Sequence, residues 1–144
     1  MTPTRERAYR TLFWIAAVYD IALGITFLFF ANEAFRLLDV EDQLPDYGGY
    51  VALIAAFLFV IGVAYVLIAR GDLERNRDLI AIGVLYKAAY SGVALYFFAI
   101  GDYPHIVFVA VFAVADLIFL VLMAECWWYL GRHHTTQDLA GAPG

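Results

Sequence analysis

The sequence has few of the residues on which metal binding, haem binding and nucleic-acid binding depend. Its 144 residues include one cysteine, Cys126, and three histidines. A lone cysteine permits neither an intrachain disulfide nor a cysteine-bound metal cluster. Haem-binding bundles need facing histidines inside the membrane, and only His105 lies beside an apolar stretch. The net charge of −5 disfavours nucleic acid, which is bound by a basic surface that displaces counterions. We expect a non-enzymatic protein with no metal, no cofactor and no nucleic-acid partner.

What the chain has instead is apolar sequence. Hydrophobic residues make up 64% of it, above the ~45–50% of ordinary soluble domains. They gather in four stretches of about 20 residues, the length of a helix that crosses a bilayer. The stretches cover about residues 12–30, 50–69, 79–100 and 106–130. No segment alternates with period 2, so no strand is predicted. The predicted fold is an all-α membrane protein, in which residues 1–132 form an antiparallel bundle of four transmembrane helices.

Basic residues lie on one side of the predicted spans. Seven arginines lie on the same side of the predicted spans as the two termini. On the opposite side the one arginine is Arg36, which stands among acidic residues. Cytoplasmic connections carry the basic excess, so we expect both termini in the cytoplasm and the protein in the cell inner membrane, with the lipid bilayer around it. The first stretch has no small-residue cleavage site after it and reaches spanning length, which indicates a span and not a cleaved signal peptide. The seven are Arg5, Arg7, Arg10, Arg70, Arg75, Arg77 and Arg132.

Two segments outside the spans have their own interpretations. In the connection of residues 31–49, Asn32 precedes a short stretch with Phe35 and Leu38 on one side. This pattern predicts a short interfacial helix on the outer membrane surface, or alternatively a lid over the bundle. Residues 133–144 are small and polar without periodicity, which predicts a disordered cytoplasmic tail.

Residues at the span ends predict where helices stop and start. Gly71 favours a left-handed cap after the second span. Asp78 and Asp102 stand where they can cap the third and fourth helices, with Pro104 in the first turn of the fourth.

Three ionisable residues lie deep inside the predicted spans. Asp20 and Lys87 each lie eight residues into a span, or about 12 Å from the inner surface, and Asp116 lies near the middle of the fourth span. A charge at such depth costs about 2.5–3.5 kcal/mol and usually pairs or faces a cavity. The lysine stem is long enough to reach either aspartate or to bridge both. Small residues on the same faces allow close helix approach and shield the charges from lipid: Ala16, Ala17, Gly24, Gly83, Ser91, Ala94 and Ala113.

Hydroxyl groups at similar depths are expected to supply the remaining hydrogen bonds. The predicted ligand or proton site consists of Asp20, Lys87, Asp116, Tyr19, Tyr65, Tyr86, Tyr90 and Ser91. Two interpretations stay open. A neutralised Asp–Lys–Asp cluster can fix helix packing and register without chemistry. Alternatively, two carboxylates around one ammonium leave a net negative site that holds a proton or binds a cationic or hydrogen-bonding ligand. Glu125 lies close to the inner surface and indicates an interfacial anchor.

Together these features resemble the small four-span bacterial membrane proteins of the DoxX-like group. The resemblance covers nearly the whole chain. It is carried by the arginine-flanked first span with Asp20 and Gly24, the Phe35–Leu38 stretch, the turn of residues 70–77, Lys87 and Asp116. Members with an assigned role are mostly linked to membrane redox systems, as partners of the catalytic chain. The resemblance implies an accessory subunit or small-ligand-binding membrane component, with a redox complex or a second copy of the chain as partner.

A second function class remains open. Small multidrug exporters also carry a lone acidic residue in the first span, which Asp20 matches. They are shorter and lack both a lysine in the third span and a long acidic outer connection. The alternative is a proton-coupled small-molecule transporter in which Asp20 is the coupling carboxylate.

Overall fold

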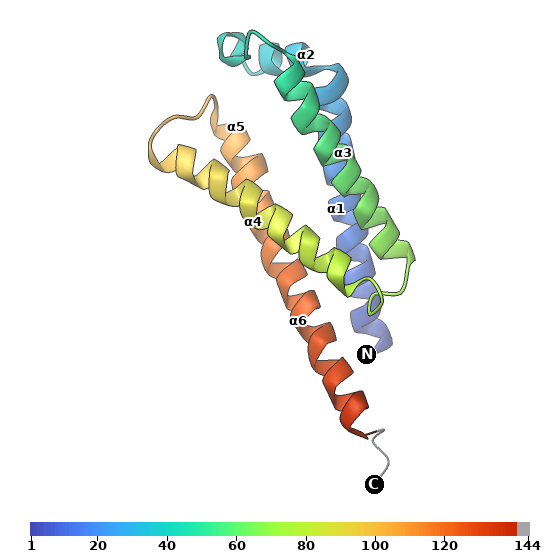
Figure 1. Ribbon diagram of the computed structural model, residues 1–144. Helices are drawn as coiled ribbons and strands as arrows, with labels where there is room; N and C mark the ends of the chain where they lie inside the picture. The colour runs from blue at the N-terminus through green and yellow to red at the C-terminus, as the bar shows by residue number, and fades with distance from the viewer. Residues whose placement is uncertain (141–144) are drawn as a thin grey trace.

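The computed structural model describes the backbone of residues 1–140 and the side chains of residues 1–132, and every regular element in that range is helical (Figure 1). The long helices are α1 (Pro3–Phe29), α3 (Gly49–Arg70), α4 (Arg77–Ala99) and α6 (Asp116–Ala140). The shorter elements are α2 (Ala31–Leu37), the 3-10 turn η1 (Glu41–Gln43), α5 (Ile106–Val109) and the π-helical segment η2 (Ala110–Ala115). The predicted all-α fold class is confirmed for the described residues.

Four helical stretches are long and apolar enough to cross a membrane: Pro3–Phe29, Gly49–Arg70, Arg77–Ala99 and Ile106–Arg132. In the most apolar part of each stretch, at most 28% of the residues are buried inside the protein. Large apolar side chains such as Val18, Leu85 and Val121 are 65–69% exposed. Water-soluble monomers rarely leave so much contiguous apolar surface uncovered. The four stretches therefore indicate a multi-pass membrane protein.

Both terminal helices are longer than predicted. α1 begins at Pro3 and not near residue 12, because proline suits the first helical turn and the polar residues that follow are compatible with a helix. α6 continues through residues 133–140, a segment for which the sequence predicted disorder, since no proline interrupts the chain between residues 105 and 140. Residues 141–144, the rest of the predicted tail, lie outside the described residues.

The left-handed glycine is not the one predicted. Gly71 follows α3 in an extended conformation, with φ −83° and ψ −169°, whereas Gly101 after α4 has φ +76°. At this second turn the Asp102 N–H donates to the Phe97 carbonyl (2.9 Å), as in a Schellman cap. Asp102 therefore closes α4 and does not begin the next helix.

The helix starts also differ from the predicted caps. The His105 ring flanks α5, and its Nδ1 accepts a hydrogen bond from the Val107 N–H (3.2 Å). Asn76, not Asp78, flanks α4. The chain has already turned at Asp72, whose carboxylate accepts the N–H groups of Glu74 (2.9 Å) and Arg75 (3.1 Å). The bond from Arg75, and then that from Glu74, hold the pKa of the Asp72 carboxyl below its usual range.

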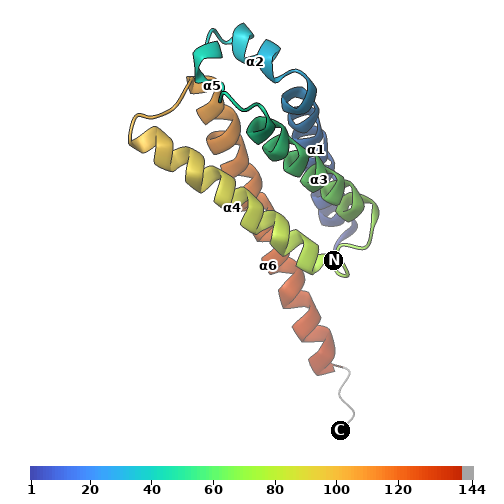
Figure 2. The same cartoon turned by 45° about the horizontal axis from the view of Figure 1, so that its top comes forward.

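The long helices pack most extensively as two pairs, α1 with α3 and α4 with α6. The start of α1 and the described end of α6 lie at one end of the molecule, named the terminal end (Figures 1 and 2). At the opposite, loop end lie α2, η1 and the connection between α4 and α5. Toward the loop end α3 and α4 diverge in both views.

The main hydrophobic core occupies the terminal half, where the two pairs meet. It contains Tyr9, Phe13, Ala16, Ala17, Tyr65, Ile68, Ala69, Leu73, Ile80, Met123, Cys126 and Leu130. A surface network also joins α1 to α6 here. Glu125 accepts hydrogen bonds from Arg5 (2.7 Å) and the Tyr9 hydroxyl (2.6 Å), and its side chain is 43% exposed. Glu125 thus reaches the protein surface, and its role as an interfacial anchor stays a prediction.

The predicted short helix after α1 is present as α2. Its preceding residue is Phe30, and no side chain caps it, so Asn32 is not the cap. Phe35 is buried, with its ring centroid 5.2 Å from that of Phe108 and 6.3 Å from that of Phe27. α2 therefore packs one aromatic side chain onto the loop end of the helices, while Leu37 is exposed.

Candidate functional site

Three charged side chains meet in the interior, between the two helix pairs. The Lys87 ammonium of α4 lies 2.7 Å from Asp20 Oδ1 of α1 and 2.8 Å from Asp116 Oδ1 of α6. The exposed fractions of the three residues are 0%, 0% and 1%. The buried Asp–Lys–Asp cluster is confirmed, and Lys87 bridges both aspartates. Since α1 belongs to one pair and α4 with α6 to the other, the cluster is a polar link between the pairs.

Small residues make this close arrangement possible. A Cβ atom on Gly24, one turn after Asp20, would lie 2.8 Å from the Phe59 backbone nitrogen, so α1 and α3 touch at backbone distance. A Cβ atom on Gly83, one turn before Lys87, would lie 2.7 Å from the Tyr65 ring. These glycines let the surrounding helices close around the charges, as small residues do at membrane helix contacts.

Aromatic rings surround the lysine. Its Nζ lies within about 6 Å of four ring centroids, the range of a cation–π interaction. The distances are 5.1 Å to Tyr19, 5.4 Å to Phe119, 5.7 Å to Tyr86 and 5.9 Å to Tyr65. Phe119 was missed by sequence reasoning, although it lies three residues after Asp116 and hence on a neighbouring part of the same helix face.

The sequence suggested that hydroxyl groups near the cluster donate hydrogen bonds to it, but three of them donate to backbone carbonyls instead. The Tyr19 hydroxyl donates to the Val111 carbonyl (2.6 Å), and the Tyr65 hydroxyl donates to the Gly83 carbonyl (3.3 Å). Ser91 Oγ donates to the Lys87 carbonyl one turn earlier (2.8 Å). The Tyr19 and Tyr65 rings lie under the ammonium, and their hydroxyls donate to the backbone of neighbouring helices. The buried Tyr86 hydroxyl makes no hydrogen bond to the described residues.

The Tyr19 bond ends on η2, a π-helical segment that the sequence did not indicate. π-Helical turns are rare and occur often at functional sites. Here the wider turn leads directly into Asp116, the first residue of α6. The Val111 carbonyl within it gains the Tyr19 hydroxyl as a partner. The segment thus joins the backbone of the fourth span to an aromatic residue of the cluster.

One oxygen of the cluster has no partner. Asp20 Oδ2 is buried and accepts no hydrogen bond from the described residues. An unsatisfied buried acceptor costs about 1–3 kcal/mol. This atom is therefore the place in the cluster where a proton or a donor group would be most stabilising.

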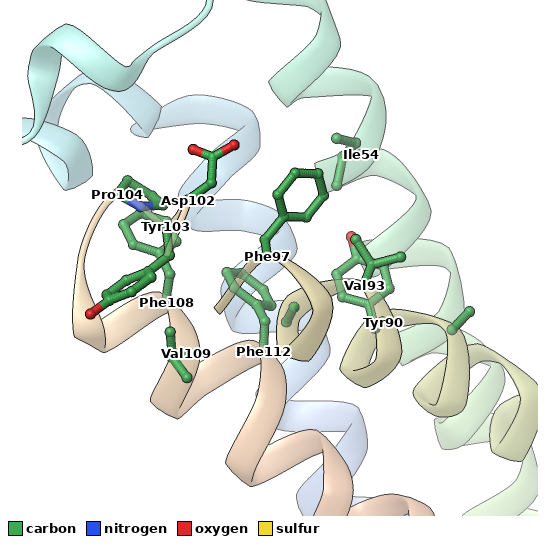
Figure 3. A pocket seen from close by; sticks show the side chains of 12 residues that line it. Ile54, Tyr90, Val93, Phe97, Asp102, Tyr103, Pro104, Phe108, Val109 and Phe112 are labelled. Atoms are coloured by element: carbon green, nitrogen blue, oxygen red, sulfur yellow. The ribbon is translucent and has the colours of Figure 1, made fainter. Parts of the chain in front are cut away.

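A cavity of about 590 Å³ lies toward the loop end, between α3, α4, the turn after α4, α5 and η2 (Figure 3). Its lining is almost wholly apolar: Ile54, Ala89, Tyr90, Val93, Ala94, Phe97, Asp102, Tyr103, Pro104, Phe108, Val109 and Phe112. A smaller cavity of about 170 Å³ shares Ile54, Phe108 and Phe112 with it.

Tyr90 connects the larger cavity to the cluster. Its ring centroid lies 5.9 Å from that of Phe112, another lining residue, and 5.0 Å from that of Tyr86. Tyr86 in turn is one of the four rings around Lys87. Tyr90 is thus a cavity residue, separated from Lys87 by one layer of aromatic side chains. Among the described side chains, no three histidines, cysteines or carboxylates gather as metal ligands.

Comparisons with protein-family models, curated proteins and solved structures find no match for this chain. The resemblance to the DoxX-like group therefore stays a prediction from the residues that carry it.

Proposed function

We propose that this protein is a non-enzymatic, multi-pass protein of the cytoplasmic membrane that binds a small apolar ligand. In this proposal the four long helices form an antiparallel transmembrane bundle with both termini in the cytoplasm. The arginines at the terminal end and the acidic residues at the loop end support this orientation. The loop end then faces outward, and the larger cavity opens in the outer half of the bilayer.

The observation that carries the proposal is the aromatic cavity between α3, α4 and α5. Its volume of about 590 Å³ lies within the range of ~300–1,000 Å³ typical of small-molecule sites. Its walls come mainly from α4, α5, η2 and the turn after α4, and Ile54 of α3 closes the remaining side. A molecule that reaches it through lipid must be largely apolar, since the lining offers few polar partners.

The buried cluster has a structural role in this proposal. It ties α1 to α4 and α6 just below the cavity, where two carboxylates enclose the ammonium. A fixed floor keeps the cavity open above it. Ligand binding without chemistry fits an accessory subunit that serves a membrane partner, as the DoxX-like resemblance implies; a redox complex or a second copy of the chain is the expected partner.

The test uses a neutral aryl diazirine, which dissolves in the bilayer and inserts into nearby side chains on illumination. In nanodiscs, labelling of residues 89–97 and 102–112 should saturate and be displaced by unlabelled aryl compound. Ala94→Trp places an indole in the cavity and should abolish the saturable part. Ala88→Trp is the matched control, because Ala88 is an exposed neighbour on α4 that does not line the cavity. Labelling that never saturates, or that survives Ala94→Trp, contradicts the proposal.

Proton-coupled transport is the second candidate, and the unpartnered Asp20 Oδ2 favours it. A proton held there would leave when a cation binds nearby. Purified protein should then release protons on binding a cationic aromatic compound, and Asp20→Asn should abolish the release. Binding without proton release in the wild-type protein rules this candidate out.

A further inference from the structure

We propose that the larger cavity selects a lipophilic organic cation, held by the faces of its aromatic side chains and by the Asp102 carboxylate at its loop end. This inference rests on the proposed function and names the chemical class of the ligand. Figure 3 shows Asp102 at the end of the cavity nearest the loops, with aromatic side chains below it.

The cavity walls favour positive charge. Five of the lining side chains are aromatic: Tyr90, Phe97, Tyr103, Phe108 and Phe112. The face of an aromatic ring carries negative potential, and several rings together form the usual binding site of large organic cations. An acyl chain would gain apolar contact from the same walls but nothing from their electrostatics.

The only formal charge among the described residues that line the cavity is negative. Asp102 is exposed and makes no ion pair within the described residues. Its side chain has no role in the turn after α4, because the cap bond there uses its backbone N–H. Asp102 is therefore available to a ligand.

The surroundings add to this preference. The segment between α1 and α3 carries one basic residue, Arg36, and its guanidinium lies 3.9 Å from Glu41. The remaining charged residues of that segment are Glu33, Asp39, Asp42 and Asp46. Such an acidic surface raises the local concentration of cations and repels anions. A phosphate headgroup would find no basic side chain among the described residues lining the cavity.

The Asp–Lys–Asp cluster below the cavity does not repel a cation. The lysine behind Tyr90 and Tyr86 lies between two carboxylates. The two carboxylates offset the positive charge of Lys87, so the ammonium does not repel a cation bound in the cavity. A cation with an apolar, aromatic body then matches every wall of the site.

The experiment compares tetraphenylphosphonium with tetraphenylborate, two ions of nearly the same size and shape but opposite charge. Binding to the purified full chain in an uncharged maltoside detergent is measured by equilibrium dialysis, with empty micelles subtracted. The phosphonium should bind at least about tenfold more tightly than the borate, and Asp102→Asn should weaken phosphonium binding about tenfold while leaving borate binding unchanged or stronger. Asp46→Asn is the matched control, since it removes an exposed acidic side chain of the same end outside the cavity; it should change binding by less than about threefold.

Each outcome separates the two proposals. Equal binding of both ions, or phosphonium binding that is insensitive to Asp102→Asn and Ala94→Trp, overturns the cation site. If the neutral diazirine still labels the cavity saturably, the ligand-binding function stands and only the ligand class is wrong. If no ion binds and the diazirine does not saturate, both proposals fail. Unchanged thermal midpoints for Asp102→Asn and Asp46→Asn exclude misfolding as the cause of a loss.

Discussion

Lys87 is the only lysine of the sequence, and its side chain is fully buried. Burying an ion pair costs several kcal/mol per charge, which the attraction between the partners repays only when the geometry is good. Here two carboxylate oxygens at hydrogen-bonding distance and four aromatic rings together stabilise the buried ammonium. The stability of the arrangement should therefore depend on the cluster as a whole, because removing one member leaves the others unpaired.

We predict that Lys87→Met alone destabilises the detergent-solubilised protein more than Lys87→Met combined with Asp20→Asn and Asp116→Asn. Removing one partner of a buried pair typically costs about 3–5 kcal/mol, whereas replacing the whole set can be neutral. Thermal midpoints of the variants in one detergent give the measurement. Arg5→Met is the control, since the Arg5–Glu125 pair is nearly half exposed and such pairs contribute about 0–1 kcal/mol. A Lys87→Met protein as stable as wild type would contradict the buried cluster.

The charges of the site were predictable, but the orientation of the side chains around them was not. Asp20, Lys87 and Asp116 stand out because each interrupts an apolar stretch and so carries an evident energetic cost. The ring faces around the ammonium depend on how α1, α4 and α6 rotate against each other. Sequence spacing gives the face of a helix but not the direction in which a tyrosine ring turns, so the tyrosines were identified while the roles of their hydroxyls were wrong.

Among the elements, α1 and α3 approach most closely. A Cβ atom on Gly24 would meet the backbone of Phe59 and Ala55 at 2.8–3.0 Å, and one on Gly62 would meet the Ile21 backbone nitrogen at 2.9 Å. Backbone atoms cannot move aside as side chains can. The two helices must therefore separate if either glycine gains a side chain.

We predict that Gly24→Ala destabilises the protein by about 1–3 kcal/mol, the usual cost of overpacking. Gly92 offers a matched control, because it also lies inside a helix and a Cβ atom there meets nothing within 4 Å. Gly92→Ala should be neutral or stabilising by up to about 1 kcal/mol, since alanine is the better helix former. Denaturation curves of the two variants test the contrast; equal effects would mean that α1 and α3 are not in backbone contact at Gly24.

The existence of the elements was easier to predict than their ends. About 20 successive apolar residues leave little choice but a spanning helix, so all four long helices were found. The caps were misassigned because Gly71 and Asp102 are each compatible with two local structures. The chain chooses between them through contacts made elsewhere, such as the cap that closes α4 on Gly101. The π-helical turn before Asp116 has no sequence signal in its alanines, valines and phenylalanine.

At the scale of the whole molecule, two helix pairs join in the terminal half and part toward the loop end. The shared core and the buried cluster hold them below, and the aromatic cavity lies where they separate. No periodicity in the sequence predicts this cavity, because its shape depends on how residues 89–97 and 102–112 pack against each other and against Ile54 of α3. The proposed function depends on how this arrangement stands in the bilayer.

Membrane topology is the measurement that tests this account most directly. Single cysteines replace Gln43 in η1 and Asp78 at the start of α4, in a chain whose buried Cys126 is changed to alanine. A membrane-impermeant maleimide should label Gln43→Cys in right-side-out vesicles and Asp78→Cys only in inside-out vesicles. That result would put the cavity in the outer half of the bilayer and the arginines in the cytoplasm. Labelling of both positions from the same side would contradict the four-span arrangement. Labelling with the two sides exchanged would keep the four spans but contradict the cytoplasmic termini and the outward-facing cavity.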